Sequence, residues 1–316
     1  MKDLTMDRTQ EITAAATRIA PYITRTPVMT ANLFGLRYPV QLKLEQMQHT
    51  GSFKARGAFN TLLSQPVPDA GLVAASGGNH GAAVAYAAHI LGHRARIYVP
   101  EIAGPSKIAL IRDLGADLVV VPGAYSAALE QALAYEAETG AMQIHAYDAP
   151  ATVHGQGTCM MEWEQQGLDA NTVLIAVGGG GLIGGAMAWL GSRGGTRRKI
   201  IAVEPAKAAT LHNALKNGPD TQTDVSGVAA NALGARQIGR ICYDLASAQN
   251  LQTITVTDDA ITTAQHALWR EARQLVEPAG ATALAALMSG AYIPAKDEKV
   301  AVLLCGANIA PDPFPK

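Results

Sequence analysis

The sequence predicts an α/β protein whose mostly parallel, twisted sheets are flanked by helices. Short apolar runs alternate with amphipathic stretches along nearly the whole chain, which indicates right-handed βαβ crossovers. The chain has 31 glycines and an aromatic content of only 5%, a balance typical of many tight strand-to-helix turns. Hydrophobic residues make up 48% of the 316 residues, which is enough for one large domain or two smaller ones.

The expected elements follow from this alternation. A helix is expected over residues 7–20, where Asp7 caps it and Pro21 ends it, and residues 25–38 are expected to be irregular. The expected strands are 40–44, 72–75, 96–99, 118–121, 142–145, 172–177, 199–203, 251–256 and 300–304. The expected helices follow the turns at 52, 81 and 182 and cover 105–115, 124–139, 152–166, 206–217, 236–246, 259–274 and 279–289. The polar, glycine-containing stretch 218–235 interrupts the alternation and is interpreted as a surface excursion or lid.

The charge balance and the cysteine usage exclude several classes of function. The net charge of −1 and the pI of about 6.7 offer no basic surface for nucleic acid or acidic membranes. Three scattered cysteines, Cys159, Cys242 and Cys305, argue against a disulfide framework and fit a reducing compartment. The polar N-terminus does not have the pattern of a signal peptide, and no apolar run is long enough to span a bilayer. We therefore expect a cytoplasmic protein.

Lys54 lies at the centre of the most informative stretch. The turn signal Thr50–Ser52 precedes an apolar helical pattern, and Ser52 is a good N-cap residue. Lys54 would then occupy the first helical turn, where the helix dipole disfavours a cation, and Phe53 offers an apolar wall. Desolvated lysines with a lowered pKa are those that form Schiff bases. The alternative interpretation is an ordinary surface lysine early in a helix.

Gly178–Gly181 follows an apolar strand and opens a helix. Four glycines allow backbone N–H groups to converge on an anion at the helix N-terminus, and phosphate is the natural ligand. A dinucleotide is the competing interpretation, because Gly179, Gly181 and Gly184 satisfy the G-x-G-x-x-G pattern and Glu204 ends the next strand. A NAD site would leave the lysine turn unexplained.

Three further stretches carry polar groups at the ends of strands or helices. Ser76–Gly81 is a second anion-binding helix start suited to a carboxylate, although it is equally compatible with a well-capped helix. Glu277 lies at a junction of two helices, and Cys305–Asn308 follows a buried strand. Two anion-binding turns, a Schiff-base lysine and a polar group at a strand end together indicate a phosphate-bearing aldehyde, pyridoxal 5′-phosphate.

The chain resembles the serine/threonine dehydratase and serine racemase family of fold-type II pyridoxal-phosphate enzymes over nearly its whole length. The resemblance rests on motifs that occur in the family order: Thr26-Pro27, Gln48–Gly57, Ser76–Gly81, Gly155–Thr158, Gly178–Leu182, Val203–Pro205, Glu277–Ala281 and Cys305–Asn308.

The resemblance implies a role for each matched residue. Lys54 forms the internal aldimine and abstracts the α-proton, and Phe53 packs beside the cofactor ring. Asn79 contacts the 3′-oxygen of the ring, Glu277 lies near the ring or the substrate, and Cys305 meets the pyridine nitrogen. The phosphate is bound by Gly178, Gly179, Gly180, Gly181 and Leu182. The substrate carboxylate is bound at the turn that contains Ser76, Gly77, Asn79 and His80.

The chain departs from the family pattern at three places. Gly77 replaces the serine that acts on the second face of the substrate in the racemases, which favours dehydration. At the family cation site, Glu204 and Ala208 match but Thr210 replaces an acidic residue, so no bound metal is expected. The regulatory extension of feedback-inhibited threonine dehydratases is not expected after Asn308.

These interpretations predict a tryptophan synthase β-like architecture, with a large cofactor-binding domain (1–68 and 149–316) and a small domain (69–148). The expected reaction is β-elimination of water and ammonia from a small L-3-hydroxy amino acid, threonine or serine, by a homodimer. Dehydration of hydroxyaspartate or phenylserine, serine racemisation, a NAD-dependent oxidoreductase and a catalytically silent binding protein are the alternatives.

Overall fold

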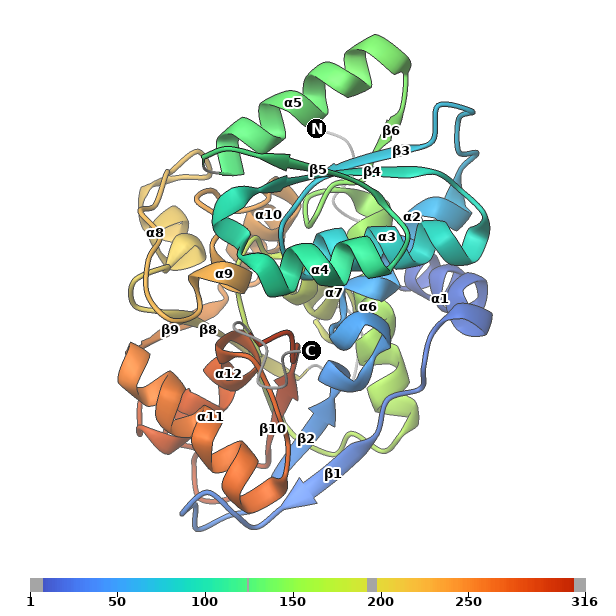
Figure 1. Cartoon of the computed structure of the whole chain (residues 1–316). Helices are drawn as coiled ribbons and strands as arrows, with labels where there is room; N and C mark the ends of the chain where they lie inside the picture. Colours follow the sequence, from blue (N-terminus) through green and yellow to red (C-terminus); the bar gives the residue numbers. More distant parts are fainter. Residues whose placement is uncertain (1–7, 124, 192–197, 310–316) are drawn as a thin grey trace.

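The computed structural model describes residues 8–123, 125–191 and 198–309, which form two sheets surrounded by helices (Figure 1). The strands are β1 (Val28–Ala31), β2 (Val40–Leu44), β3 (Leu72–Ala75), β4 (Ala95–Pro100), β5 (Asp117–Val121), β6 (Met142–Gln143), β7 (Thr172–Ala176), β8 (Lys199–Pro205), β9 (Gln252–Val256) and β10 (Val300–Leu304). The expected α/β fold with mostly parallel sheets is confirmed.

The helices follow the strands in regular alternation. They are α1 (Arg8–Ile19), α2 (Lys54–Ser64), α3 (Asn79–Leu91), α4 (Pro105–Asp113), α5 (Tyr125–Thr139), α6 (Pro150–Gln165), α7 (Gly181–Leu190), α8 (Thr210–Asn217), α9 (Ala230–Leu233), α10 (Arg240–Ala248), α11 (Asp258–Ala272) and α12 (Pro278–Met288). Short 3₁₀ helices are η1 (Ala20–Tyr22), η2 (Glu45–Met47), η3 (His49–Gly51) and η4 (Glu101–Ala103).

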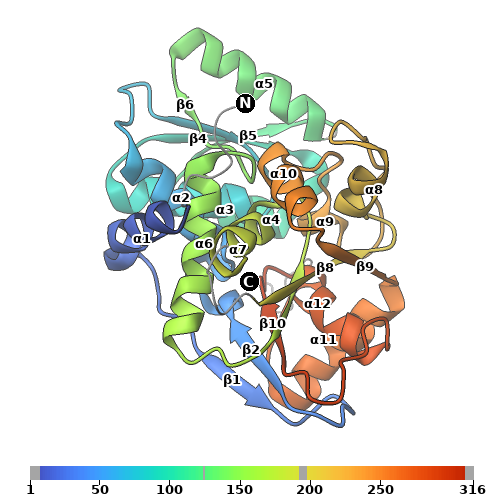
Figure 2. The same ribbon diagram turned by 180° about the vertical axis from the view of Figure 1, so that it is seen from behind.

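The larger sheet has the strand order β1-β2-β10-β7-β8-β9, in which only β1 is antiparallel to its neighbour. Helices α11 and α12 cover one face (Figure 1), and α6 and α7 cover the other (Figure 2). Leu304 at the end of β10 pairs with Leu44 at the end of β2. The carboxyl ends of β2 and β10 therefore lie side by side, and β7 runs parallel to β10 on its other side.

The smaller sheet has the strand order β5-β4-β3-β6, and all its strands are parallel. Both faces of β3 are covered. Leu72 and Ala74 pack into one hydrophobic cluster with α2 and α3, whereas Val73 and Ala75 pack into another with α5. Such double burial explains why β3 reads as a continuous apolar run. The strands of this sheet lie between residues 72 and 143, and the domain boundaries at 69 and 148 stay a prediction.

Two local expectations are wrong, and one cannot be compared with the structure. Residues 25–38 are not wholly irregular, because β1 pairs with β2 as an edge strand with little burial. Ser52 is not the N-cap of α2; Phe53 holds that position without a side-chain cap. The expected cap Asp7 lies outside the described residues. No helix in the described part of the chain is both long and apolar enough to cross a membrane.

Candidate active site

Lys54 follows β2 of the larger sheet in sequence and contacts a segment that follows the smaller sheet. It begins α2, and its amine donates a 2.6 Å hydrogen bond to the carbonyl oxygen of Ala146, which follows the smaller sheet's β6. The amine also lies 5.1 Å from the centroid of the Phe53 ring. Burial lowers the pKa of Lys54 to about 8, with Cys305 opposing part of the shift. The amine therefore supplies its neutral, nucleophilic form more readily than a solvated lysine does.

The turn before Lys54 is held to the turn after β10 by three hydrogen bonds. The N–H of Phe53 donates to the carbonyl of Cys305 at 3.2 Å, and the N–H of Ala307 donates to the carbonyl of Gly51 at 2.8 Å. The side chain of Asn308 donates to the carbonyl of Thr50 at 2.7 Å. Thr50 and Gly51 both have positive φ angles, 60° and 72°, a conformation that glycine adopts without steric cost.

Cys305 presents a buried thiol beside this lysine. Its sulfur donates to the carbonyl oxygen of Ala279 at 3.5 Å, and burial raises its pKa well above the usual value for a thiol. The group therefore stays a neutral thiol at physiological pH. A neutral partner cannot hold a pyridine nitrogen protonated in the way that a carboxylate does.

Asn79, Glu277 and Asn308 form a chain of hydrogen bonds. The Asn79 amide donates to the Glu277 carboxyl group and accepts a 2.7 Å hydrogen bond from Asn308. Burial raises the pKa of Glu277 to about 7, although the Asn79 hydrogen bond and Lys107 oppose the shift. The chain connects α3, α12 and the turn after β10, and it joins Asn79, expected at the cofactor ring, to Glu277, expected near the ring or the substrate.

The Ser76–Gly81 turn leads from β3 into α3 and forms the second predicted anion site. The Ser76 hydroxyl accepts a hydrogen bond from the N–H of Gly78 at 3.3 Å. The Nε2 atom of His80 lies 2.8 Å from the carbonyl oxygen of Ile144 and must be the donor there. Burial lowers the pKa of His80 to about 3, so the ring is neutral and acts as a structural donor.

The Gly178–Leu182 turn leads from β7 into α7 and forms the first predicted anion site. Neighbouring chain segments approach its glycines so closely that side chains have no room. A Cβ on Gly178 would lie 2.9 Å from the backbone of Leu233, and one on Gly179 would lie 2.3 Å from the Tyr147 ring. Gly180 has a φ of 92°. Leu182, only 4% exposed, anchors the first turn of α7 in the core.

The stretch 218–235 contains α9 and lies between the Ser76–Gly81 turn and the Gly178–Leu182 turn. Its Leu233 packs on Gly178, and the carbonyl of Asn231 would lie 3.4 Å from a Cβ on Gly78. Figures 1 and 2 both show α9 beside α4. The sequence indicated an excursion or lid here but did not identify these contact residues.

Glu204, which matches the family cation site, caps helix α8 instead. Glu204 is fully buried, and its carboxyl oxygens accept hydrogen bonds from the N–H groups of Leu211 and His212 at 2.7 and 2.9 Å. Burial raises its pKa to about 7. Among the described residues, no group of three or more potential His, Cys, Asp or Glu ligands comes together. The same capping leaves Glu204 unsuited to bind a ribose, as the dinucleotide interpretation requires.

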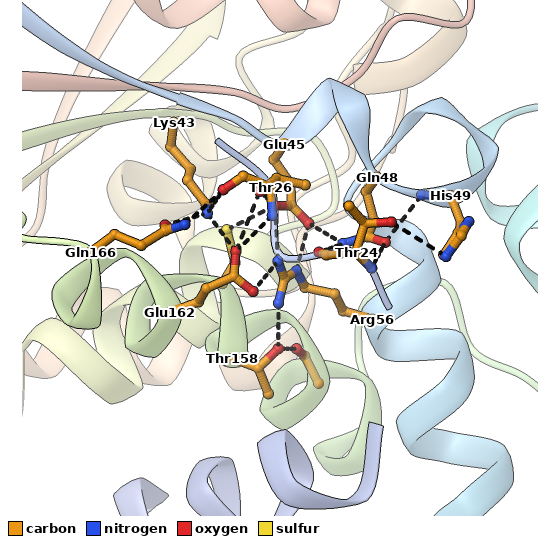
Figure 3. Close-up of polar contacts among 12 residues, drawn as sticks. Thr24, Thr26, Lys43, Glu45, Gln48, His49, Arg56, Thr158, Glu162 and Gln166 are labelled. Carbon is orange, nitrogen blue, oxygen red and sulfur yellow. Dashed lines mark hydrogen bonds and ion pairs between the residues drawn. The ribbon is translucent and has the colours of Figure 1, made fainter. Parts of the chain in front are cut away.

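A buried ionic cluster lies two residues beyond Lys54 (Figure 3). Arg56 contacts Glu45 and, at 2.9 Å, Glu162, while Lys43 contacts Glu162 at 2.5 Å. Lys43, Glu45 and Arg56 are fully buried, and Glu162 is 9% exposed. The two cations and two anions balance, and they join α2 to β2 and α6.

The arrangement fits a pyridoxal phosphate group. A desolvated amine, a neutral thiol and a side-chain amide come from α2, the end of β10 and the start of α3. The glycine turn that opens α7 provides a helix N-terminus for a phosphate. The hydroxyl oxygens of Thr50 and Ser52 are buried without a hydrogen-bond partner among the described atoms. Such orphaned polar groups beside the lysine are consistent with a pocket that a polar ligand completes.

The chain is similar to known proteins over most of its length. A family model described as "Pyridoxal-phosphate dependent enzyme" matches residues 19–306. An L-threonine ammonia-lyase of Geobacter sulfurreducens is 33% identical over 302 residues, which cover 94% of this chain and 75% of the relative.

Solved structures of related proteins have the same fold, and two of them serve as examples. A threonine deaminase from T.th. is 35% identical with a TM-score of 0.88, covering 96% of this chain and 99% of that one. A maize serine racemase is 29% identical with a TM-score of 0.87, covering 95% and 93%.

Proposed function

The chain belongs to the family of pyridoxal-phosphate dependent enzymes, and we propose that it is an ammonia-lyase that acts on L-threonine or L-serine. The reaction removes the α-proton and the β-hydroxyl group, and hydrolysis then gives a 2-oxo acid and ammonia. The observation that carries the proposal is the desolvated amine of Lys54, which lies between the Phe53 ring and the Ala146 carbonyl beside the neutral thiol of Cys305.

When bound, the cofactor supplies an aldehyde that condenses with the substrate amine and a conjugated ring that withdraws electrons from the α-carbon. Lys54 would hold the cofactor at rest and, once released, would take the α-proton. Its pKa of about 8 suits a general base near neutral pH. Phe53 would provide the apolar wall for the ring, and Asn79, held by Glu277 and Asn308, would orient it.

Cys305 would favour elimination, and the two turns would hold the phosphate and the carboxylate. A neutral thiol leaves the ring a weaker electron sink than an acidic partner would, which favours prompt loss of the β-hydroxyl group. Gly178 to Leu182 would hold the phosphate at the start of α7. Ser76, Gly77, Asn79 and His80 would position the substrate carboxylate at the start of α3, where the helix dipole favours an anion.

Dehydration is favoured over racemisation by the residue at position 77. A racemase needs a proton donor on the second face of the substrate, and Gly77 has no side chain. A Cβ there would lie 2.3 Å from the Cβ of Ala103, so a longer side chain has no room. The similarity to a maize serine racemase nevertheless makes racemisation the alternative to test.

The experiment is an incubation of the purified protein with L-threonine, L-serine, phenylserine and hydroxyaspartate. We expect 2-oxo acid and ammonia in equal amounts from threonine or serine, measured with a coupled dehydrogenase and by chiral chromatography. Formation of the D-enantiomer without 2-oxo acid would refute the choice of reaction. Turnover of phenylserine or hydroxyaspartate alone would refute the choice of substrate.

We also propose that the enzyme is a cytoplasmic homodimer. The three cysteines are free and buried, which fits a reducing compartment. Eight large apolar side chains are exposed among the described residues, including Met47 at 54%, Trp269 at 49% and Leu275 at 39%, and a dimer interface would cover part of this apolar surface. Light scattering after size-exclusion chromatography measures the oligomeric state directly, and a monomer mass at micromolar concentration would refute the dimer.

A further inference from the structure

Lys107 is a buried lysine that none of the assignments above uses. It lies in the first turn of α4, in the part of the chain that contains the smaller sheet, and only 5% of its surface is exposed. Among the described residues, no hydrogen bond or ion pair engages its amine. Its aliphatic stem is buried, whereas its ammonium is not fully enclosed and has no protein partner among the described residues, so the charge is available to an anionic ligand.

The amine is directed at the Ser76–Gly81 turn. Its Nζ atom would lie 3.9 Å from a Cβ built on Gly78, and the carbonyl of Asn231 faces the same position at 3.4 Å. Ser76 to Gly78 are partly exposed, so the amine and the turn border one opening. The turn leads into α3, whose first N–H groups and dipole already favour an anion.

The charge of this turn alone is smaller than the charge of a carboxylate. A helix N-terminus carries the equivalent of roughly half an elementary charge, whereas a substrate carboxylate brings a full negative charge. Glu277 is the acidic group whose field acts on Lys107, but its carboxyl group is hydrogen-bonded to Asn79. Among the described residues, Glu277 and Lys107 form no ion pair.

We propose that Lys107 binds the α-carboxylate of the amino-acid substrate together with the Ser76–Gly81 turn. This assignment rests on the function proposed above, because it takes the ligand to be an amino acid. The cofactor phosphate is the less favoured ligand of Lys107, because the nearest neighbours of the predicted phosphate turn, Gly178–Leu182, include Tyr147, Leu233 and Cys242 but not Lys107. Lys107 is thus a substrate-binding residue contributed by α4, which packs against α3.

The test compares two ligands that differ only at the carboxylate. L-alanine and L-alaninamide both lack a leaving group, so their binding to the holoenzyme is measured by calorimetry without turnover. Lys107→Met should weaken L-alanine binding roughly ten- to hundredfold, the range of a charge-assisted hydrogen bond. L-alaninamide binding should change less than about twofold, because it offers no charge to the lysine.

Three further variants sharpen the result. Arg112→Met removes an exposed charge from the same helix and should leave binding of both ligands unchanged. Lys107→Arg should recover part of the L-alanine affinity, and Lys107→Gln provides a polar replacement should the methionine variant fail to fold. In steady-state assays with L-threonine, Lys107→Met should raise KM more than it lowers kcat.

Two outcomes would overturn the assignment. Equal weakening of both ligands would mean that Lys107 supports the structure of the site rather than binding the carboxylate, and unchanged L-alanine binding would leave it without a role in the substrate site. The proposed function is judged separately, by 2-oxo acid formation in the wild-type protein. Selective loss of L-alanine binding in a protein that does not deaminate threonine or serine would therefore support Lys107 and refute the reaction.

Discussion

The amine of Lys54 donates its 2.6 Å hydrogen bond to the carbonyl oxygen of Ala146, and this contact joins α2 to the loop after the smaller sheet. The same loop supplies the Ile144 carbonyl to His80 and the Tyr147 ring to Gly179. Residues 144–147 therefore contact Lys54, the Ser76–Gly81 turn and the Gly178–Leu182 turn. The expected cofactor pocket is defined as much by residues 144–147 as by the motifs recognised in the sequence.

Adding one methyl group to Gly179 should disturb the proposed phosphate site. The new Cβ would lie 2.3 Å from the Tyr147 ring, so the ring must move out of its place beside the turn. We expect Gly179→Ala to weaken cofactor binding about tenfold or more, as overpacking of about 1–3 kcal/mol implies. Fluorescence titration of the apoprotein with pyridoxal phosphate measures this.

Gly184 provides the matched control in the same helix. A Cβ there would make only ordinary contact, at 3.6 Å from Val153. Gly184→Ala should therefore bind the cofactor within about twofold of the wild type, a shift well below 1 kcal/mol. Equal losses in both variants would show that the glycine turn is not the phosphate site. The dinucleotide interpretation makes the opposite prediction for Gly184, because its third glycine is required for close packing.

Gly77→Ser should cost stability without creating a racemase. Its Cβ would lie 2.3 Å from the Cβ of Ala103 and 3.1 Å from Val99, and overpacking of this kind costs about 1–3 kcal/mol. The double variant Gly77→Ser/Ala103→Gly should recover part of that loss and form more D-serine than the wild type does. Urea unfolding and chiral chromatography measure the two effects. A fully stable single variant would contradict the steric account.

Arg56→Met should strongly destabilise the fold. It would leave the fully buried Glu45 without its main cation, and breaking a buried ion pair on one side costs about 3–5 kcal/mol. The exposed pair Lys299–Asp169 serves as control, with both side chains 64% exposed. Lys299→Met should change the free energy of unfolding by less than about 1 kcal/mol. Similar effects in the two variants would contradict the role given to the buried cluster.

The neutral ring of His80 should make the folded protein sensitive to acid. Its pKa falls from 6.5 to about 3, mainly because of burial, so the unfolded chain binds the proton more readily between these two values. The stabilising contribution is therefore present above pH 6.5 and is lost as the pH falls towards 3, by up to roughly 1.4 kcal/mol per pH unit.

The effect can be isolated by comparison with a variant that does not titrate. Between pH 7.5 and 5.5, the wild type should lose about 1.4 kcal/mol more unfolding free energy than His80→Gln, measured in urea. The glutamine amide of this variant keeps a donor for the Ile144 carbonyl. Parallel pH profiles for the two proteins would mean that His80 is charged or solvated in the folded state.

The sequence predicts those features of the fold that arise from local pattern. Parallel strands bring their carboxyl ends to one edge of a sheet, which is why the turns at Lys54, Ser76–Gly81, Gly178–Leu182 and Cys305 could be expected near one another. Hydrophobic runs bounded by glycine predicted most strands and helices, and the predicted bounds lie within a few residues of those in the structure. The roles of these turn residues stay predictions.

Other features depend on contacts that no local pattern specifies. Lys43 alternates with apolar residues along β2 and Glu45 follows the strand, yet both are fully buried, and Lys43 pairs with Glu162 of α6. Ser52 looks like a cap, yet Thr50 and Gly51, with positive φ before it, lead into a turn in which its hydroxyl is buried without a partner among the described atoms. Tyr147 and Lys107 reach the site from the part of the chain that contains the smaller sheet, and nothing in their neighbourhoods marks them.

The central claim is that the amine of Lys54 carries the cofactor. The purified protein is reduced with sodium borohydride, digested, and analysed by peptide mass spectrometry. We expect a pyridoxyl phosphate group on the peptide that contains Lys54 and on no other lysine, with the visible absorbance lost on reduction. An unmodified Lys54 in a protein saturated with pyridoxal phosphate, or a stable label on a different lysine, would contradict the assignment.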